Sequence, residues 1–103
     1  MAVVHIAVFR WKPEADLAAV VEALRKIQGV ADDIPEIIEI CVARNLSKYD
    51  EGYTHVVLVR GESQDAIDAY RNHPDHVVAA AVIEAAEEHG IGVDFDAETP
   101  LEA

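Results

Sequence analysis

The segment 3–11 alternates with the two-residue period of a β-strand, yet both of its faces are apolar. One face carries Val3, His5, Ala7, Phe9 and Trp11, and the other carries Val4, Ile6 and Val8. A strand with one face in solvent would be polar at every second position. The pattern therefore predicts a strand that is covered on both sides.

Two longer segments and one shorter segment also alternate like strands. In residues 36–45 one face is expected to carry Ile38, Ile40 and Val42, and the other Ile37, Cys41 and Ala43. Residues 53–60 and 91–95 complete a set of four predicted strands. A polar loop at 45–52 separates the second strand from the third.

Apolar residues at three- and four-residue spacing predict the helices. The first is expected to start near Pro13 and to end at Gly29, with Leu17, Val20, Val21, Leu24 and Ile27 on its apolar side. Ser63 is the expected N-cap of a second helix. Pro74 cannot continue that helix without the loss of a hydrogen bond, so it is expected to start a third. This third helix is expected to end near His89, which would cap it.

The predicted order is strand, helix, strand, strand, helix pair, strand. It is the order of a ferredoxin-like α+β protomer, a split β-α-β arrangement with four antiparallel strands, in one domain spanning residues 1–103. Helices can cover only one face of such a sheet. Because the strands are apolar on both faces, we expect the sheet of a second copy to cover the other face in a homodimer.

Charge and composition exclude several classes of partner. The 103 residues include 8 basic and 20 acidic ones, a net charge of −12, so neither nucleic acid nor an anionic membrane is an expected partner. No apolar run approaches the roughly 18 residues of a membrane span, and the N-terminus is expected to form a strand rather than a signal peptide. The single cysteine, Cys41, allows no internal disulfide, which favours a reducing cytoplasm.

Residues 51–76 concentrate groups that can transfer protons near neutral pH, namely Tyr53, His55, Tyr70, His73 and His76. An imidazole suits the removal of a proton next to a carbonyl, because its ordinary pKa is about 6.5. A phenol suits the polarisation of a carbonyl under attack. The alternative is that Tyr70 and His76 only hydrogen-bond across the junction of two helices and hold it together.

Several motifs resemble those of the stress-responsive dimeric α/β-barrel (Dabb) domain family. In order along residues 3–95 they are Val4-His5 with Phe9-Arg-Trp-Lys-Pro13, Ile34-Pro35, Asn45-Leu-Ser47, Tyr53-Thr-His55, Tyr70-x-x-His-Pro-x-His76 and Val93-Asp-Phe95. The resemblance implies a ferredoxin-like protomer whose sheet packs on that of a second protomer to form a closed barrel. The family includes stress proteins without an assigned reaction. It also includes polyketide cyclases of the olivetolic acid cyclase type, which perform an intramolecular aldol condensation without a cofactor.

The resemblance also implies roles for individual residues. In a cyclase, His76 would be the general base, Tyr70 the acid or carbonyl polariser, and Asp94 the carboxylate that orients His76. The substrate, a small and largely apolar carbonyl compound, would be bound by His5 and His55 in a pocket lined by Leu24, Ile27 and Val82. No cofactor and no metal is implied. The aliphatic run 77–82 departs from the pocket lining of the cyclases, so the substrate itself is not specified.

The sequence leaves other interpretations open. His5 and His55 can be buried histidines satisfied by hydrogen bonds; with His73 or His76 they would offer three imidazoles to a zinc ion, although their spacing is not a metal signature. The protein can also be a non-enzymatic stress or assembly protein, or a cofactor-free monooxygenase-like enzyme on the same barrel. A cavity on which Tyr70 and His76 converge would favour an enzyme.

Overall fold

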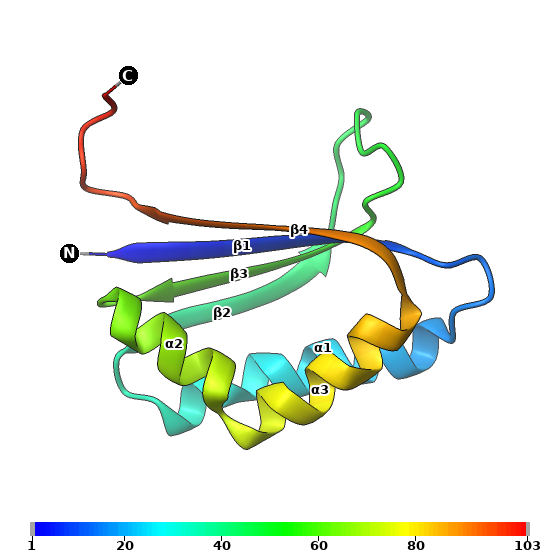
Figure 1. The fold of residues 1–103 in the computed structure, drawn as a ribbon, viewed down its shortest axis with the longest axis horizontal. Helices are drawn as coiled ribbons and strands as arrows, with labels where there is room; N and C mark the ends of the chain where they lie inside the picture. Colours follow the sequence, from blue (N-terminus) through cyan, green and yellow to red (C-terminus); the bar gives the residue numbers. More distant parts are fainter. Residues whose placement is uncertain (1, 103) are drawn as a thin grey trace.

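The structure, a computed structural model, describes residues 2–102. Its elements are β1 (Val3–Trp11), α1 (Leu17–Gly29), a 3-10 turn η1 (Val30–Asp33), β2 (Ile37–Arg44), β3 (His55–Gly61), α2 (Gln64–Asn72), α3 (Pro74–Ala86) and β4 (Glu87–Asp96). The strands form one antiparallel sheet in the order β2-β3-β1-β4. Figure 1 shows α1, α2 and α3 on one side of this sheet. The predicted ferredoxin-like α+β fold is confirmed.

A side-chain cap decides where α1 begins. The helix starts at Leu17, one turn later than the predicted start near Pro13. The Asp16 carboxylate accepts hydrogen bonds from the amides of Ala18 and Ala19 at 3.1 and 3.2 Å. It thereby satisfies two of the amides that have no partner inside the helix, which fixes the N-terminus at this point.

The junction between α2 and α3 forms at the predicted break. Ser63 caps α2 as expected. His73 has an extended backbone between the two helices, and its Nδ1 accepts the amide of Asp75 at 3.0 Å, which caps α3. Pro74 is the first residue of α3, where its missing N–H leaves no hydrogen bond unmade. This turn places His76 in the first turn of α3.

The boundary between α3 and β4 differs from the prediction. The helix ends at Ala86 and the strand begins at Glu87, so the predicted helix end at His89 and the predicted strand start at Ile91 are wrong. The reason is strand pairing, because Trp11 at the end of β1 already pairs with Glu87. Hydrogen bonds along all of β1 outweigh the local helical preference of this alanine- and glutamate-rich segment. His89 is thus a strand residue and not a helix cap.

β2 contains a register shift that reverses one predicted face assignment. The side chain of Ile37 is in the core at 5% exposure, whereas Ile38 is 56% exposed. The shift lies between Ile37 and Glu39 in the pairing with β3. It places Ile37, rather than Ile38, on the same face as Ile40.

The core fills the space between the inner face of the sheet, which faces the helices, and the helices themselves. Tyr70 is the largest of its fully buried side chains, at 1% exposure. Around it the core includes Val20, Leu24, Ile27, Val57, Val59, Ile67, Ala79 and Ile83. Burial of these side chains is the main source of stability of the fold.

The outer face of the sheet is covered by no helix and is largely apolar. Strand pairing aligns its side chains in three rows across the sheet: Cys41–Leu58–Ile6–Val93, Ala43–Val56–Val8–Ile91 and Glu39–Arg60–Val4–Phe95. On β4 alone, Ile91, Val93 and Phe95 are 44%, 49% and 44% exposed. The second cover that the apolar alternation predicts is therefore not supplied by residues 2–102 of the same chain.

Two segments outside the helices and strands lie on the side of the sheet that the helices do not cover. In Figure 1 the loop between β2 and β3 and the segment after β4 both extend away from the helices. Within residues 2–102, no helix has the length and apolar character that crossing a membrane requires.

Candidate functional site

A cavity of about 150 Å³ lies between the inner face of the sheet and the helices. A cavity of this size can hold a molecule about as large as benzene. Most of its lining is apolar, supplied by Ala7, Phe9, Ile27, Val57, Ala80 and Ile83. Its polar and titratable groups are His5, Tyr70, His76, Glu84 and Glu87. An apolar pocket with a few convergent polar groups is the usual form of a site for a small molecule.

Tyr70 and His76 converge on this cavity across the α2–α3 junction. Their ring centroids are 4.6 Å apart and the rings are nearly perpendicular, at 68°. Burial raises the pKa of the Tyr70 phenol well above its ordinary value of 10, and the charge of Arg71 opposes this only in part. The phenol is therefore protonated at neutral pH and can donate a hydrogen bond.

The imidazole of His76 is uncharged near neutral pH. Burial is the largest cause that lowers its pKa, and the neighbouring His5 lowers it further. The charge and the backbone of Arg71 act in opposite directions, and the Glu84 carboxylate raises the pKa. An uncharged imidazole can accept a proton, so the pair offers a donor and an acceptor side by side.

His5 carries the carboxylate partner that was expected for His76. Its Nδ1 lies 2.7 Å from Oδ1 of Asp94, directly across the β1–β4 pairing. Because an ionised carboxylate can only accept, Nδ1 of His5 holds the ring proton. The predicted arrangement, in which Asp94 orients His76, is not the one that the structure shows.

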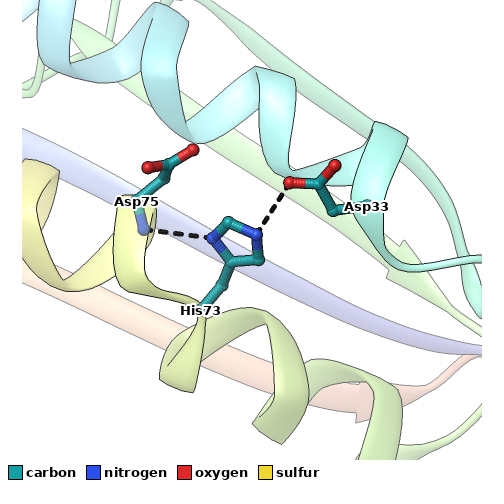
Figure 2. Close-up of side chains that lie close together, drawn as sticks. All are labelled: Asp33, His73 and Asp75. Atoms are coloured by element: carbon teal, nitrogen blue, oxygen red, sulfur yellow. Dashed lines mark hydrogen bonds and ion pairs between the residues drawn. The ribbon is translucent and has the colours of Figure 1, made fainter.

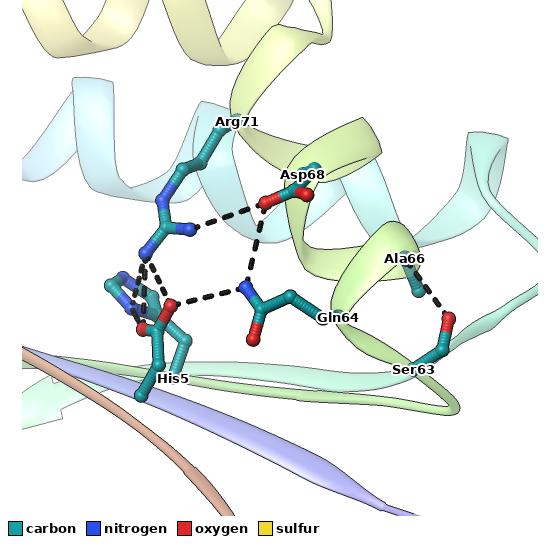
Figure 3. Close-up of polar contacts among 7 residues, drawn as sticks. His5, Ser63, Gln64, Ala66, Asp68 and Arg71 are labelled. Atoms are coloured by element: carbon teal, nitrogen blue, oxygen red, sulfur yellow. Dashed lines mark hydrogen bonds and ion pairs between the residues drawn. The ribbon is translucent and has the colours of Figure 1, made fainter.

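Asp94 is fixed by a network from α2, whose members Gln64 and Arg71 are labelled in Figure 3 beside His5. Arg71 Nη2 donates to both of its oxygens at 3.0 and 2.9 Å, and Gln64 Nε2 donates at 3.2 Å. Burial acts to raise the pKa of Asp94, but the hydrogen bonds from His5, Arg71 and Gln64 outweigh burial and hold this pKa below its ordinary value. The network ties α2 to β4 at the edge of the cavity and holds His5 in place.

His55 lies on the predicted face of the sheet but outside the cavity. It pairs with Phe9, whereas His5 pairs with Val59, so the two histidines are four positions apart along the strands, about 13 Å. Nδ1 of His55 accepts the indole N–H of Trp11 at 2.9 Å. Burial, followed by the charge of Arg44, lowers the pKa of this histidine. His55 therefore matches the alternative of a buried histidine satisfied by hydrogen bonds.

The predicted pocket lining is found only in part. Ile27 lines the cavity with His5, Tyr70 and His76, whereas Leu24 lies in the core and Val82 is partly exposed against α1. Asp94 acts on the cavity only through His5.

Two carboxylates of the cavity, Glu84 and Glu87, were missed from the sequence. Burial is the first cause that raises the pKa of Glu87, and the Glu84 charge adds to it. A periodic signal was available, since residues 76, 80, 84 and 87 succeed one another at helical spacing. The prediction placed this segment at the end of the third helix and assigned no role to its glutamates.

One further cluster offers ligand atoms for a metal within residues 2–102, formed by Asp33, His73 and Asp75 (Figure 2). Both ring nitrogens of His73 already have partners: Nδ1 accepts the Asp75 amide, and Nε2 lies 2.9 Å from Oδ2 of Asp33. Because Nδ1 accepts, Nε2 carries the proton that a metal would have to replace. These contacts tie η1 to the helix junction, which is a structural role.

Comparison with known proteins agrees with this architecture. The family model of the Stress Responsive A/B Barrel Domain matches residues 3–97. Olivetolic acid cyclase from Cannabis sativa is 33% identical over 79 residues, which cover 75% of this chain and 78% of that protein.

Three solved structures extend the comparison. A dimeric ferredoxin-like protein of unknown function from Thermobifida fusca YX has a TM-score of 0.79 at 27% identity, covering 92% of this chain and 90% of that one. A second such protein, from Jannaschia sp. CCS1, has a TM-score of 0.84 at 22% identity, with coverages of 93% and 99%. SnoaB, a cofactor-independent oxygenase from Streptomyces nogalater, has a TM-score of 0.74 at 15% identity, with coverages of 99% and 98%. The last two likenesses concern the fold alone.

Proposed function

Because the chain belongs to the stress-responsive A/B barrel domain family, we propose that it is a cofactor-independent cyclase acting on a small carbonyl compound. The observation that carries this proposal is that Tyr70 and His76, whose ring centroids are 4.6 Å apart, both line an apolar cavity. One is a protonated donor and the other an uncharged acceptor, the two groups that an aldol condensation requires. The 33% identity to a protein named olivetolic acid cyclase supports the same class of reaction.

In the proposed reaction, His76 removes a proton from the carbon between two carbonyl groups of a poly-β-keto chain. The resulting enolate carbon attacks a second carbonyl of the same chain, and the new carbon–carbon bond closes a ring. Tyr70 donates a hydrogen bond to the oxygen of that carbonyl while negative charge develops on it. The proton held by His76 then neutralises the alkoxide, so that base and acid return to their starting states.

His5 has a supporting role in this proposal. It lines the cavity, and its orientation is held by Asp94 and Arg71. Since Nδ1 faces Asp94, Nε2 is the ring nitrogen left to contact a hydroxyl or enol of the substrate. Asp94 thus positions His5 in place of the expected His76.

The proposal includes a homodimer formed through the outer face of the sheet. No helix within residues 2–102 covers the apolar rows of β1, β3 and β4, and exposed apolar area such as that of Ile91, Val93 and Phe95 marks an interface. The Thermobifida fusca protein, whose fold is similar, is described as dimeric. The mass of the protein in solution, measured by light scattering, tests this part directly.

An oxygenase is the second candidate, since SnoaB, a cofactor-independent oxygenase, has a similar fold. The same Tyr70–His76 pair would then deprotonate a substrate that reacts with molecular oxygen. The two candidates differ in their co-reactant, since an aldol closure proceeds unchanged without oxygen. A non-enzymatic barrel protein is the remaining possibility and predicts turnover by neither route.

Activity on poly-β-keto thioesters tests the proposal, with wild type compared with Tyr70→Phe and His76→Ala under air and under nitrogen. The cyclase predicts a cyclised product under both atmospheres that is lost in both variants. Tyr49→Phe is a matched control, because this tyrosine is 75% exposed on a loop. Equal product distributions in all four proteins would contradict the proposal, and loss of product only under nitrogen would favour the oxygenase.

A further inference from the structure

The two ends of the cavity differ in chemistry. Phe9 is four residues from His5 along β1, and Glu84 is eight residues from His76 along α3, so one end has His5, Tyr70 and His76, whereas the other has Phe9 with the two carboxylates Glu84 and Glu87. The glutamates are three residues apart across the end of α3, so they lie on the same side of it. The lining includes no lysine or arginine. Within residues 2–102, neither glutamate forms an ion pair with a basic side chain, in contrast to Glu88, which pairs with Arg10 at 2.8 Å.

The position of the Glu87 carboxylate depends on a glycine. A Cβ added to Gly90 would lie 2.6 Å from Oε2 of Glu87 and 3.6 Å from Cδ1 of Phe9. The carboxylate therefore folds back over the bare backbone of Gly90, beside the Phe9 ring. Any side chain at position 90 would displace the carboxylate from this place.

A partly buried carboxylate without a cationic partner is an unfavourable arrangement unless a ligand completes it. Burial and the nearby Glu84 charge raise the pKa of Glu87, and the His89 charge opposes this only in part, which reflects the same unfavourable environment. A hydrogen bond donated to Glu87 by a hydroxyl or an amine of the ligand would stabilise the carboxylate. A carboxylate on the ligand would instead add a third negative charge beside Glu84 and Glu87.

We propose that Glu87, together with Glu84, determines the specificity of the cavity: it accepts a hydrogen bond from a hydroxyl or amine at the end of the substrate remote from Tyr70 and excludes substrates with a carboxylate there. This inference rests on the proposed function, because it requires the substrate carbonyl to lie in the cavity beside both Tyr70 and His76. The apolar middle of the cavity and its volume of about 150 Å³ limit the part between the two ends to about one six-membered ring.

Three aryl ketones of similar size test the inference: acetophenone, 3-hydroxyacetophenone and 3-acetylbenzoate. Dissociation constants are measured by NMR titration of the whole chain. Wild type is expected to bind the hydroxy ketone about tenfold more tightly than acetophenone, and the carboxylate about tenfold more weakly. In Glu87→Gln the penalty on the carboxylate is expected to fall at least fivefold. In Glu87→Leu the advantage of the hydroxyl is expected to disappear.

Glu88→Gln is the matched control, because it removes the same charge from a neighbouring glutamate outside the cavity lining. Unchanged binding of acetophenone by the Glu87 variants shows that their cavity is intact. Equal effects of Glu87→Gln and Glu88→Gln would overturn the inference, because they would trace the selectivity to net charge. Equal binding of all three ketones by wild type, weakened by Tyr70→Phe, would overturn the selectivity and leave the carbonyl site standing. If wild type bound none of the three, both proposals would fail.

Discussion

His55 is buried in the sheet and His76 is half-buried in the first turn of α3, and burial lowers the pKa of both, yet their surroundings differ. His55 is held by the Trp11 indole and lies 2.8 Å from the Thr54 hydroxyl through the same nitrogen. His76 instead contacts the Tyr70 ring, with ring centroids 4.6 Å apart, and lines an open cavity with it. A lowered histidine pKa therefore reports burial in both places, and only the adjacent cavity and proton donor distinguish a candidate catalytic group from a structural one.

The largest expected effect is on turnover. His76→Gln should lower kcat/KM on a poly-β-keto thioester by about 10²–10⁴-fold, because a general base contributes on this scale. His55→Gln should lower it by less than about tenfold, because His55 lies outside the cavity. Steady-state kinetics of the two variants measure the difference. Comparable losses would mean that the two histidines do not differ in the way proposed.

The second effect concerns stability, and here the larger change is expected at His55 rather than at His76. His55→Phe should reduce the free energy of unfolding by about 1–3 kcal/mol, because it leaves the Trp11 indole N–H without its acceptor. Trp11→Phe should reduce the free energy of unfolding less in the His55→Phe variant than in wild type, because in the variant it removes a donor that already lacks an acceptor. Urea unfolding measures both quantities. His89→Phe, which removes an exposed bond to Tyr53, is the control and should change stability by less than about 0.5 kcal/mol.

The pH dependence follows from the sign of the two pKa shifts. For both histidines the folded pKa lies below the ordinary 6.5, so in the window between the two values the unfolded chain binds more protons. The free energy of unfolding should therefore be constant above about pH 7 and fall as the pH drops below 6.5. kcat/KM should follow the protonation of His76 and stay flat through pH 7 before it declines on the acid side. If kcat/KM already declined above pH 7 as the pH is lowered, the result would contradict a base with a lowered pKa.

The smallest effect concerns His5, the third histidine, which alone among these three has a carboxylate partner. Asp94→Asn should lower the free energy of unfolding at pH 7 by about 1 kcal/mol or less, because the network is partly solvated. The folded pKa of Asp94 lies below its ordinary 3.8, so its contribution is present above pH 3.8 and is lost as the pH falls through the folded pKa. Thermal unfolding of wild type and variant should therefore converge in acid. A difference that persists in acid would assign the effect to packing.

Local signals predicted the part of the site that lies on one continuous segment. The motif from Tyr70 to His76 contains its own stop and start signals, because His73 caps and Pro74 begins the next helix. The strand face of His5 and His55 was also predictable from alternation. Their separation was not, because it depends on which residues of β1 and β3 pair.

Features set by distant pairing were missed for the same physical reason. The bond between His5 and Asp94 follows from the register of β1 against β4, which links residues 89 positions apart. The exposure of Ile38 follows from one shift in the pairing of β2. In each case the alternative register has the same local pattern, and long-range hydrogen bonding decides between them.

The uncovered rows of the outer face link the stability of this protein to its abundance. If a second copy covers Ile6, Val8, Ile91, Val93 and Phe95, folding and association become one equilibrium. The midpoint of thermal unfolding would then rise with protein concentration, and dilution alone would lower it. The same substitution would look more damaging at low expression than at high expression, although its effect on the contacts within one chain is the same.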